Sequence, residues 1–167
     1  MSVIIRPPLP GDETALGPLH NHIWRIAYAG LMPSDYLQAR SDVEATQRWK
    51  RLIRMLDRNR RDSNGRTVLV AEDGNRLVGF ITVGPARDQE MDGFVELMSL
   101  YVHPDARGTG VAQKLTDHGL SDGPSYLWVL DRNRRAQAFY CKLGYDLDGA
   151  TKPHEPTRTT EVRMIRY

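Results

Sequence analysis

The sequence lacks the features that mark several classes of protein. Its 167 residues include one cysteine, Cys141, so no disulfide can form within the chain, as in proteins of a reducing compartment. No apolar run approaches the roughly 20 residues that cross a bilayer, and no basic stretch followed by an apolar one opens the chain. We therefore expect a cytoplasmic protein with no membrane partner.

The sequence also lacks an excess of charge of one sign. Lysine and arginine total 23 and aspartate and glutamate total 21, which gives a formal net charge of +2 at pH 7. This balance gives no strong electrostatic footprint for nucleic acid, so we expect no nucleic-acid partner. The arginine-rich segment Arg48–Arg66 is the local exception, and an RNA-binding face there is an alternative to a solvated helix end. The histidines and the cysteine show no metal-ligand spacing, so we expect no metal.

The composition is that of a globular protein. With 40% hydrophobic and 26% charged residues, the chain has enough apolar surface for a sizeable core, and its length suits one domain. No internal repeat or linker divides it. We expect residues 1–167 to form a single domain.

Hydrophobic periodicity predicts a strand and two helices before residue 60. The strand covers Val3–Arg6, and a helix follows with Asp12 as its N-cap and an end near Gly30. Ser41 and Glu44 then have the spacing of a capping box, which marks the start of the second helix.

The period changes to that of strands from residue 67. Two β-rich runs, Thr67–Glu72 and Leu77–Val83, are joined by a hairpin turn at Asp73–Arg76. The polar stretch Pro85–Gly93 is expected to be an exposed, mobile loop. A further strand, Phe94–Val102, comes after it.

A strand, a tight turn and a helix follow one another around residue 105. His103-Pro104-Asp105 ends the strand, and Gly108 and Gly110 precede a helix that contains Val111, Ala112 and Leu115. Glycine tolerates positive φ and lets a ligand approach the backbone, and the first turn of a helix offers free N–H donors and the positive end of its dipole. The junction is therefore an anion site, most naturally for a phosphate or pyrophosphate.

Neither of the two common glycine-rich phosphate fingerprints is present. The pattern Arg107-x-x-Gly110-x-Ala112 instead resembles the coenzyme A loop of the GNAT superfamily of N-acetyltransferases, which reads Gln/Arg-x-x-Gly-x-Gly/Ala after a strand. The stretch Tyr126–Leu130 followed by Asn133–Tyr145 looks like the next motif of that family, in the right order.

The resemblance implies a fold and a reaction. The fold is α/β (α+β), with a mixed, mostly antiparallel twisted sheet of six to seven strands flanked by about four helices. The reaction is acetyl transfer from acetyl-CoA, as co-substrate, to a primary amine by direct attack.

The resemblance also implies which backbone groups bind the coenzyme. In the family the fourth strand splays from the fifth at a bulge. The backbone groups that this frees pair with the pantetheine arm and polarise the thioester carbonyl. The matching residues here are Leu100, Tyr101 and Val102. The pyrophosphate would lie on the N–H groups of Arg107, Gly108, Thr109, Gly110, Val111 and Ala112. Asn133 matches a coenzyme-contacting asparagine and is also a candidate N-cap.

Two side chains match groups that transfer protons in the family. Tyr140 corresponds to the tyrosine that protonates the leaving thiolate, although a packing tyrosine with its hydroxyl in solvent is the alternative. Glu96 corresponds to a glutamate that deprotonates the amine in some members, and burial would have to raise its pKa toward neutrality. A glutamate that faces solvent is the alternative. Cys141 is expected to be a small buried residue and not a nucleophile.

The acceptor is the least readable part of the sequence. Trp24 and Tyr28 lie four apart on one helix face, either as packing residues or as walls of the acceptor site, and the loop Lys152–Pro156 approaches that site in relatives. A small-molecule amine is favoured, with a protein N-terminus or lysine as the alternative acceptor. A non-catalytic acyl-CoA sensor is the rival function, and a homodimer is left open.

Overall fold

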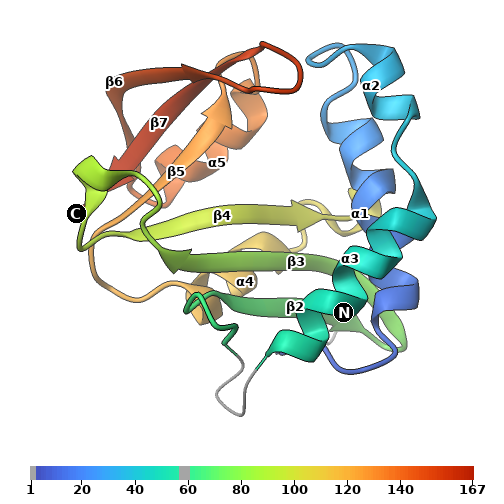
Figure 1. Cartoon of the computed structure of the whole chain (residues 1–167). Coiled ribbons are helices and arrows are strands. Elements are labelled where there is room, and N and C mark those ends of the chain that lie inside the picture. Colours follow the sequence, from blue (N-terminus) through green and yellow to red (C-terminus); the bar gives the residue numbers. More distant parts are fainter. Residues whose placement is uncertain (1–2, 57–60) are drawn as a thin grey trace.

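The computed structural model describes residues 3–56 and 61–167 (Figure 1). The strands are β1 (Val3–Arg6), β2 (Thr67–Asp73), β3 (Arg76–Pro85), β4 (Val95–Val102), β5 (Ser125–Leu130), β6 (Asp146–Pro153) and β7 (Thr160–Arg166). The α-helices are α1 (Glu13–Ala27), α2 (Ser34–Gln38), α3 (Asp42–Met55), α4 (Val111–Gly119) and α5 (Arg134–Lys142). None of these helices is long and apolar enough to cross a membrane.

The seven described strands form one sheet in the order β1-β2-β3-β4-β5-β7-β6. Only β4 and β5 pair in parallel, and the other neighbours are antiparallel. The predicted mixed, mostly antiparallel sheet is therefore confirmed. Five α-helices flank it where about four were expected, because the connection after α1 contains the short helix α2.

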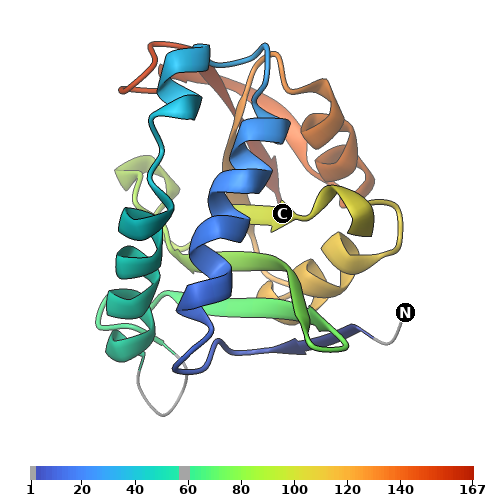
Figure 2. The same cartoon turned by 90° about the vertical axis from the view of Figure 1, so that its right-hand side faces the viewer.

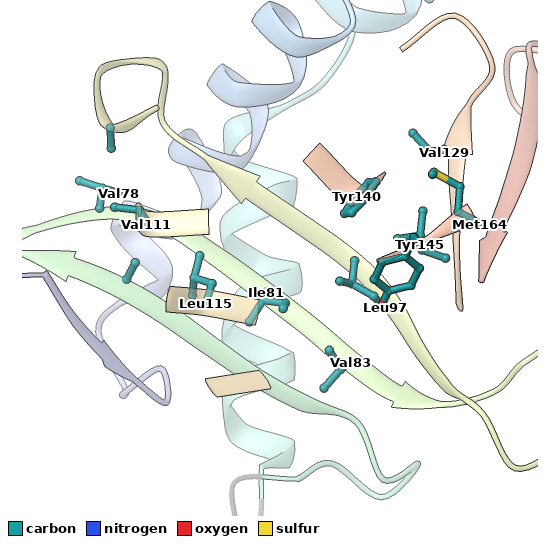
Figure 3. Packing of buried hydrophobic residues seen from close by; sticks show 13 residues of the cluster. Val78, Ile81, Val83, Leu97, Val111, Leu115, Val129, Tyr140, Tyr145 and Met164 are labelled. Carbon is teal, nitrogen blue, oxygen red and sulfur yellow. The ribbon is translucent and has the colours of Figure 1, made fainter. Parts of the chain in front are cut away.

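Helices cover both faces of the sheet, and each face has its own core. Figure 2 shows α1 and α3 on one side and α4 and α5 on the other. On the α4/α5 side, Ile81 of β3 packs with Leu115 of α4 and Tyr140 of α5 in one buried cluster (Figure 3). On the α1/α3 side, Phe80 of β3 packs with Trp49 of α3. Neighbouring residues of β3 thus serve opposite cores, as strand geometry requires.

The start of α1 differs from the prediction. Asp12 occupies the N-cap position, but its carboxylate accepts hydrogen bonds from the Arg6 guanidinium at 2.6 and 3.1 Å and does not cap the helix. The ion pair with Arg6 takes the carboxylate away from the helix N–H groups. The helix ends at Ala27, and a turn carries the chain to Gly30, whose φ is +73°.

The cap of the next long helix is confirmed. The Ser41 hydroxyl oxygen accepts from the backbone N–H of Glu44 at 3.2 Å, and α3 begins at Asp42. The arginine-rich segment that follows contains Arg58 and Arg60, which lie outside the described residues.

The polar stretch Pro85–Gly93 between β3 and β4 is mostly exposed, as its composition predicts, but it is also tied to the sheet. It contains a 3-10 turn at Gln89–Met91, and Met91 is only 6% exposed. The indole N–H of Trp128 donates to the Asp88 carboxylate at 2.7 Å. Side-chain contacts with the sheet therefore hold this segment in place.

The sheet opens between β4 and β5. These strands pair only at Val95 with Ser125 and at Glu96 with Tyr126, and Figure 1 shows β5 turning away from β4 beyond this point. In the β3–β4 ladder, Thr82 faces Ser99 and Val83 faces Leu97, so Met98 is the extra residue of a β-bulge. The predicted splay at a bulge is confirmed.

Candidate active site

A cavity of about 260 Å³ lies where β4 and β5 separate. Most of the residues predicted to bind ligands line it: Tyr28, Leu100, Tyr101, Val102, Arg107, Gly108, Ala112, Asn133 and Tyr140. The predicted residues Trp24, Glu96, Thr109, Gly110 and Val111 are not part of its lining. Beyond Glu96, the backbone groups of β4 that point toward β5 have no strand partner in the described sheet, so they are free for a ligand.

The turn before α4 needs glycine for its conformation. Gly108 and Gly110 have φ values of +75° and +87°, in the left-handed region that side chains disfavour. A Cβ added at either position would meet nothing within 4 Å, so their backbone is open on that side. Thr109 donates its hydroxyl to the Ala106 carbonyl at 2.7 Å, and Val111 is buried in the core, so only the backbone of Val111 could serve a ligand.

Two arginines give the cavity a cationic end. The Nη2 atom of Arg107 is buried and has no hydrogen-bond partner among the described residues. Burial, with a contribution from the like charge of Arg135, lowers the pKa of the Arg107 guanidinium. Arg135 also lines the cavity, and sequence reasoning missed it although it follows Asn133 within the recognised motif. An anionic group placed here would accept a hydrogen bond from Arg107 Nη2 and would reduce the repulsion between the two guanidinium groups.

The second motif places a tyrosine hydroxyl at the same cavity. Asn133 Oδ1 accepts from the N–H of Ala136 at 3.3 Å, which confirms the predicted cap of α5. Tyr140 is 8% exposed and packs 6.0 Å from the ring of Tyr145, so its side chain does not reach into bulk solvent. Burial, with smaller contributions from the neighbouring tyrosines, raises the pKa of Tyr140, so its hydroxyl stays protonated at neutral pH.

Glu96 does not have the environment that a general base needs. It is 2% exposed; Arg87 Nε donates to its Oε2 at 2.8 Å, and the Tyr126 hydroxyl donates to the same oxygen at 3.0 Å. Burial alone would raise the pKa of Glu96, but the bonds and the charge of Arg87, together with the Tyr126 bond, lower it below its ordinary value. The rise in pKa that a general base would require is therefore absent in this structure, and the carboxylate fastens the segment before β4 to the sheet.

Cys141 is exposed, contrary to the expectation of a small buried residue. The helix α5 buries Tyr140 and Gln137 on its inner face, and the following position turns away from that face.

A pair of tyrosine hydroxyls closes the cavity toward α1. The Tyr28 and Tyr101 hydroxyl oxygens are 3.0 Å apart, and burial raises the pKa of both groups. The prediction assigned Tyr101 only a backbone role. His20 packs 5.5 Å from the Tyr101 ring, and burial lowers the pKa of this imidazole to about 3, so it is neutral at neutral pH.

Trp24 belongs to the packing behind this wall. Its ring lies 4.8 Å from that of Tyr28 and carries the Arg40 guanidinium 3.9 Å from its centroid. Nearby, the rings of Tyr36 on α2 and His154 lie 6.2 Å apart, so the β6–β7 connection meets α2 beside the tyrosines.

Trp128 of β5 is a wall of the cavity that sequence reasoning missed. Its position in an apolar strand gave no sign of this, because only the splay exposes it. The Lys152 ammonium lies 4.1 Å from the centre of its ring, and the Arg163 guanidinium lies 5.5 Å from it. Within residues 3–56 and 61–167, no three His, Cys, Asp or Glu side chains come together in a way that could hold a metal ion.

Comparison with known proteins connects this geometry to a family. Residues 64–147 match a family described as an acetyltransferase (GNAT) domain. A probable N-acetyltransferase of Mycobacterium tuberculosis is 24% identical over 171 residues, which span 99% of this chain and 92% of the relative. The peptidyl-lysine N-acetyltransferase YjaB of Escherichia coli is 34% identical over 100 residues, or 59% of this chain and 62% of that protein.

The fold also matches solved structures. The PaiA N-acetyltransferase of Thermoplasma acidophilum, determined in complex with coenzyme A, superimposes with a TM-score of 0.75 and 22% identity, and 99% of each chain is covered. This likeness supports the same arrangement of sheet and helices.

Proposed function

The chain belongs to the GNAT family of N-acetyltransferases and is thus an acyltransferase, and we propose that its acyl donor is acetyl-CoA and its acceptor a primary amine that attacks the thioester directly. The single domain that carries this activity is proposed to span residues 1–167.

The observation that carries the proposal is the cavity at the splay, with free strand backbone along one side and an unmet guanidinium donor at one end. A pyrophosphate is the kind of group that Arg107 Nη2, Arg135 and the open Gly108 backbone would bind. An extended arm with amide groups is the kind of chain that the unpaired β4 backbone would hold. The residues present therefore fit coenzyme A at both points.

Backbone donors of β4 are proposed to stabilise the charge that develops on the thioester oxygen. Pairing of Leu100–Val102 with β3 fixes this part of the β4 backbone, so the N–H groups that point toward β5 need no reorganisation as the charge forms. A preorganised donor of this kind is worth about 3 kcal/mol in other acyl transfers.

Tyr140 is proposed to donate its proton to the departing thiolate. A thiol has an ordinary pKa of about 8.5, below that of a tyrosine hydroxyl, so the donation depends on close positioning and on rapid recovery of the proton. The raised pKa of Tyr140 ensures that the proton is present when the sulfur leaves.

The acceptor is proposed to be a small-molecule amine that enters beside Tyr28 and Tyr101. A protein lysine is the second candidate, and the similarity to a peptidyl-lysine N-acetyltransferase favours it. Since Glu96 is fixed by Arg87, we propose that the amine loses its proton to solvent before it attacks.

The test is free-thiol release from acetyl-CoA with a panel of small amines and lysine peptides, together with calorimetric acetyl-CoA binding on the same sample. Amine-dependent release supports the transferase and identifies the acceptor class. Binding without release on any amine favours an acyl-CoA sensor, and absence of binding contradicts the proposed site.

A pair of arginine variants tests the site itself. Arg107→Met should weaken acetyl-CoA binding by about tenfold, because a charge-assisted contact of about 1.5 kcal/mol or more is lost. Arg132→Met is the matched control, since Arg132 is exposed and lies outside the cavity lining. Equal binding by both variants would contradict the assignment of Arg107.

A further inference from the structure

One lysine of the chain lies against the wall of the cavity. Lys152 of β6 stands directly opposite Glu161 of β7 in the antiparallel ladder, where opposite charges ordinarily pair. Its ammonium instead lies 4.1 Å from the centre of the Trp128 ring, and Trp128 lines the cavity. Within the described chain no carboxylate comes within 4.0 Å of the Lys152 ammonium.

The strand register places this lysine on the α1/α2 side of the sheet, where the acceptor amine is proposed to enter. Trp128 is the cross-strand partner of Arg163 and Leu130 is that of Glu161, so these side chains share one face. Leu130 packs with Met32, and Tyr28 packs against the same cluster, which places that face on the α1/α2 side. Lys152 shares this face through its pairing with Glu161.

Tyr140 reaches the same cavity from the opposite face. It belongs to the α4/α5 core together with Leu97 and Val129, whereas Lys152 and Trp128 lie on the α1/α2 side. The splay between β4 and β5 is the opening through which groups from the two faces can meet. An amine on the α1/α2 side and a thioester held near Tyr140 on the α4/α5 side can thus meet in this opening.

We propose that the chain acetylates its own Lys152, with the lysine acting as an acceptor amine inside the active site. The proposal rests on the proposed function, since it needs acetyl-CoA in the cavity. The Lys152 side chain can leave the Trp128 ring, because a cation–π contact at a partly exposed site is weak.

The transfer balances without any further reactant. The Lys152 ammonium first loses one proton to solvent, and the free electron pair of its nitrogen then attacks the thioester carbonyl carbon. The N–C bond forms, the C–S bond breaks, and the electron pair of that bond leaves on sulfur. Tyr140 protonates the thiolate and regains a proton as the new amide nitrogen loses its second one. The products are an acetylated Lys152, free coenzyme A and one proton released to solvent.

The small number of lysines makes a sharp test practical. The chain contains four, Lys50, Lys114, Lys142 and Lys152, and the first three are exposed whereas Lys152 is partly buried. Chemical acetylation by acetyl-CoA in solution would therefore favour the other three. Preference for Lys152 requires that the active site direct the transfer.

The purified protein would be incubated with acetyl-CoA and the acetyl occupancy of each lysine followed by peptide mass spectrometry, with calorimetric acetyl-CoA binding on the same sample. We expect Lys152 to be acetylated at least about tenfold faster than any other lysine, because the amine is held beside the thioester. The rate should not change as the protein is diluted, and Tyr140→Phe should slow Lys152 alone. Lys152→Arg should abolish the fast phase, and Lys142→Arg should leave it intact.

The outcomes separate this proposal from the proposed function. Binding of acetyl-CoA with Lys152 no faster than the exposed lysines would overturn self-acetylation and leave the transferase standing. A rate that falls on dilution would overturn transfer within one molecule. Absence of acetyl-CoA binding would overturn the proposed function and this inference together.

Discussion

At the scale of single residues, neighbouring charge decides what each buried group can do. Tyr140 and Glu96 are both almost fully buried, yet the pKa of the tyrosine is raised and that of the carboxyl is lowered. The difference is the partner: Arg87 bonds to Glu96, whereas the rings that pack on Tyr140 are those of Phe139 and Tyr145, which carry no charge. One group is kept ready to give a proton, and the other is kept ionised as part of the structure.

The role of Tyr140 gives the first prediction at this scale. Tyr140→Phe should lower kcat by about a hundredfold and leave acetyl-CoA affinity unchanged, because general acid catalysis contributes at least that much and the ring is retained. Steady-state kinetics and calorimetry measure the two quantities. Tyr167→Phe, at an exposed position, is the control. Wild-type turnover in the Tyr140 variant would remove the general-acid role.

The second prediction concerns Glu96 and pH. Because its pKa is lowered in the folded state, the ion pair stabilises the fold above the ordinary pKa of glutamate, about 4.3, and this stabilisation is lost as pH falls through the lowered value. Glu96→Gln should therefore cost about 1–3 kcal/mol at pH 7, and the cost should shrink in strong acid. Urea unfolding at several pH values measures it.

The control for this variant is Glu155→Gln. Glu155 pairs with Arg158 at 3.7 Å on the surface and should contribute little. If Glu96→Gln kept full stability and lost most of its kcat, Glu96 would be the general base after all.

At the scale of elements, the strand-turn-helix junction and the opening beside it make the cavity. The junction depends on local preferences of Gly108 and Gly110, and the start of α5 on the Asn133 cap, which is why the sequence was sufficient to predict both. The opening depends on where the β4–β5 pairing stops, which is set by the whole sheet. The elements were predictable wherever capping, turns and periodicity act within a few residues.

The site was less predictable where contacts join distant parts of the chain. Arg87 and Glu96 lie nine residues apart and Asp88 and Trp128 forty, and no local pattern signals either contact. The same holds for Lys152 over Trp128. Composition correctly showed that Pro85–Gly93 is polar, but polarity did not reveal that its charged side chains bond to residues of the sheet.

The glycine turn gives a prediction at this scale. Gly110→Ala adds a side chain at a φ of +87° with no steric neighbour within 4 Å, so the strain should cost about 1–2 kcal/mol of stability. The turn should relax toward negative φ, and acetyl-CoA binding should weaken by about tenfold.

A second glycine provides a matched control. Gly93 has a φ of +84°, also with nothing within 4 Å, and belongs to the β3–β4 connection and not to the turn before α4. Gly93→Ala should lose similar stability in denaturant unfolding and keep its acetyl-CoA affinity. Equal loss of affinity in the two variants would mean that general destabilisation, and not the turn, explains the effect.

At the scale of the whole molecule, the proposed function gives each face of the sheet its own substrate. The cationic end with Arg107 and Arg135 and the Tyr140 hydroxyl belong to the α4/α5 side, and the tyrosine pair and Trp128 belong to the side of α1. Two substrates that enter from different sides can be bound together.

This arrangement predicts a sequential kinetic pattern. Initial rates with both substrates varied should give intersecting double-reciprocal lines, since direct attack needs a ternary complex. Cys141→Ser should leave the pattern and kcat unchanged, because Cys141 is exposed and lies outside the cavity lining. Parallel lines, the mark of a covalent intermediate in turnover, would contradict direct transfer.

The splay between β4 and β5 also bears on how the molecule avoids association with itself. A sheet that divides partway along has two extra edges inside it, and an open edge is ordinarily a template for strand addition by another chain. Here side chains from both faces, among them Ile23 of α1 and Phe139 of α5, line the cavity beside the unpaired backbone, so another chain could not add a strand there without displacing them. A ligand that fits between these side chains can still pair with the unpaired backbone, so an edge that would otherwise favour aggregation serves ligand binding.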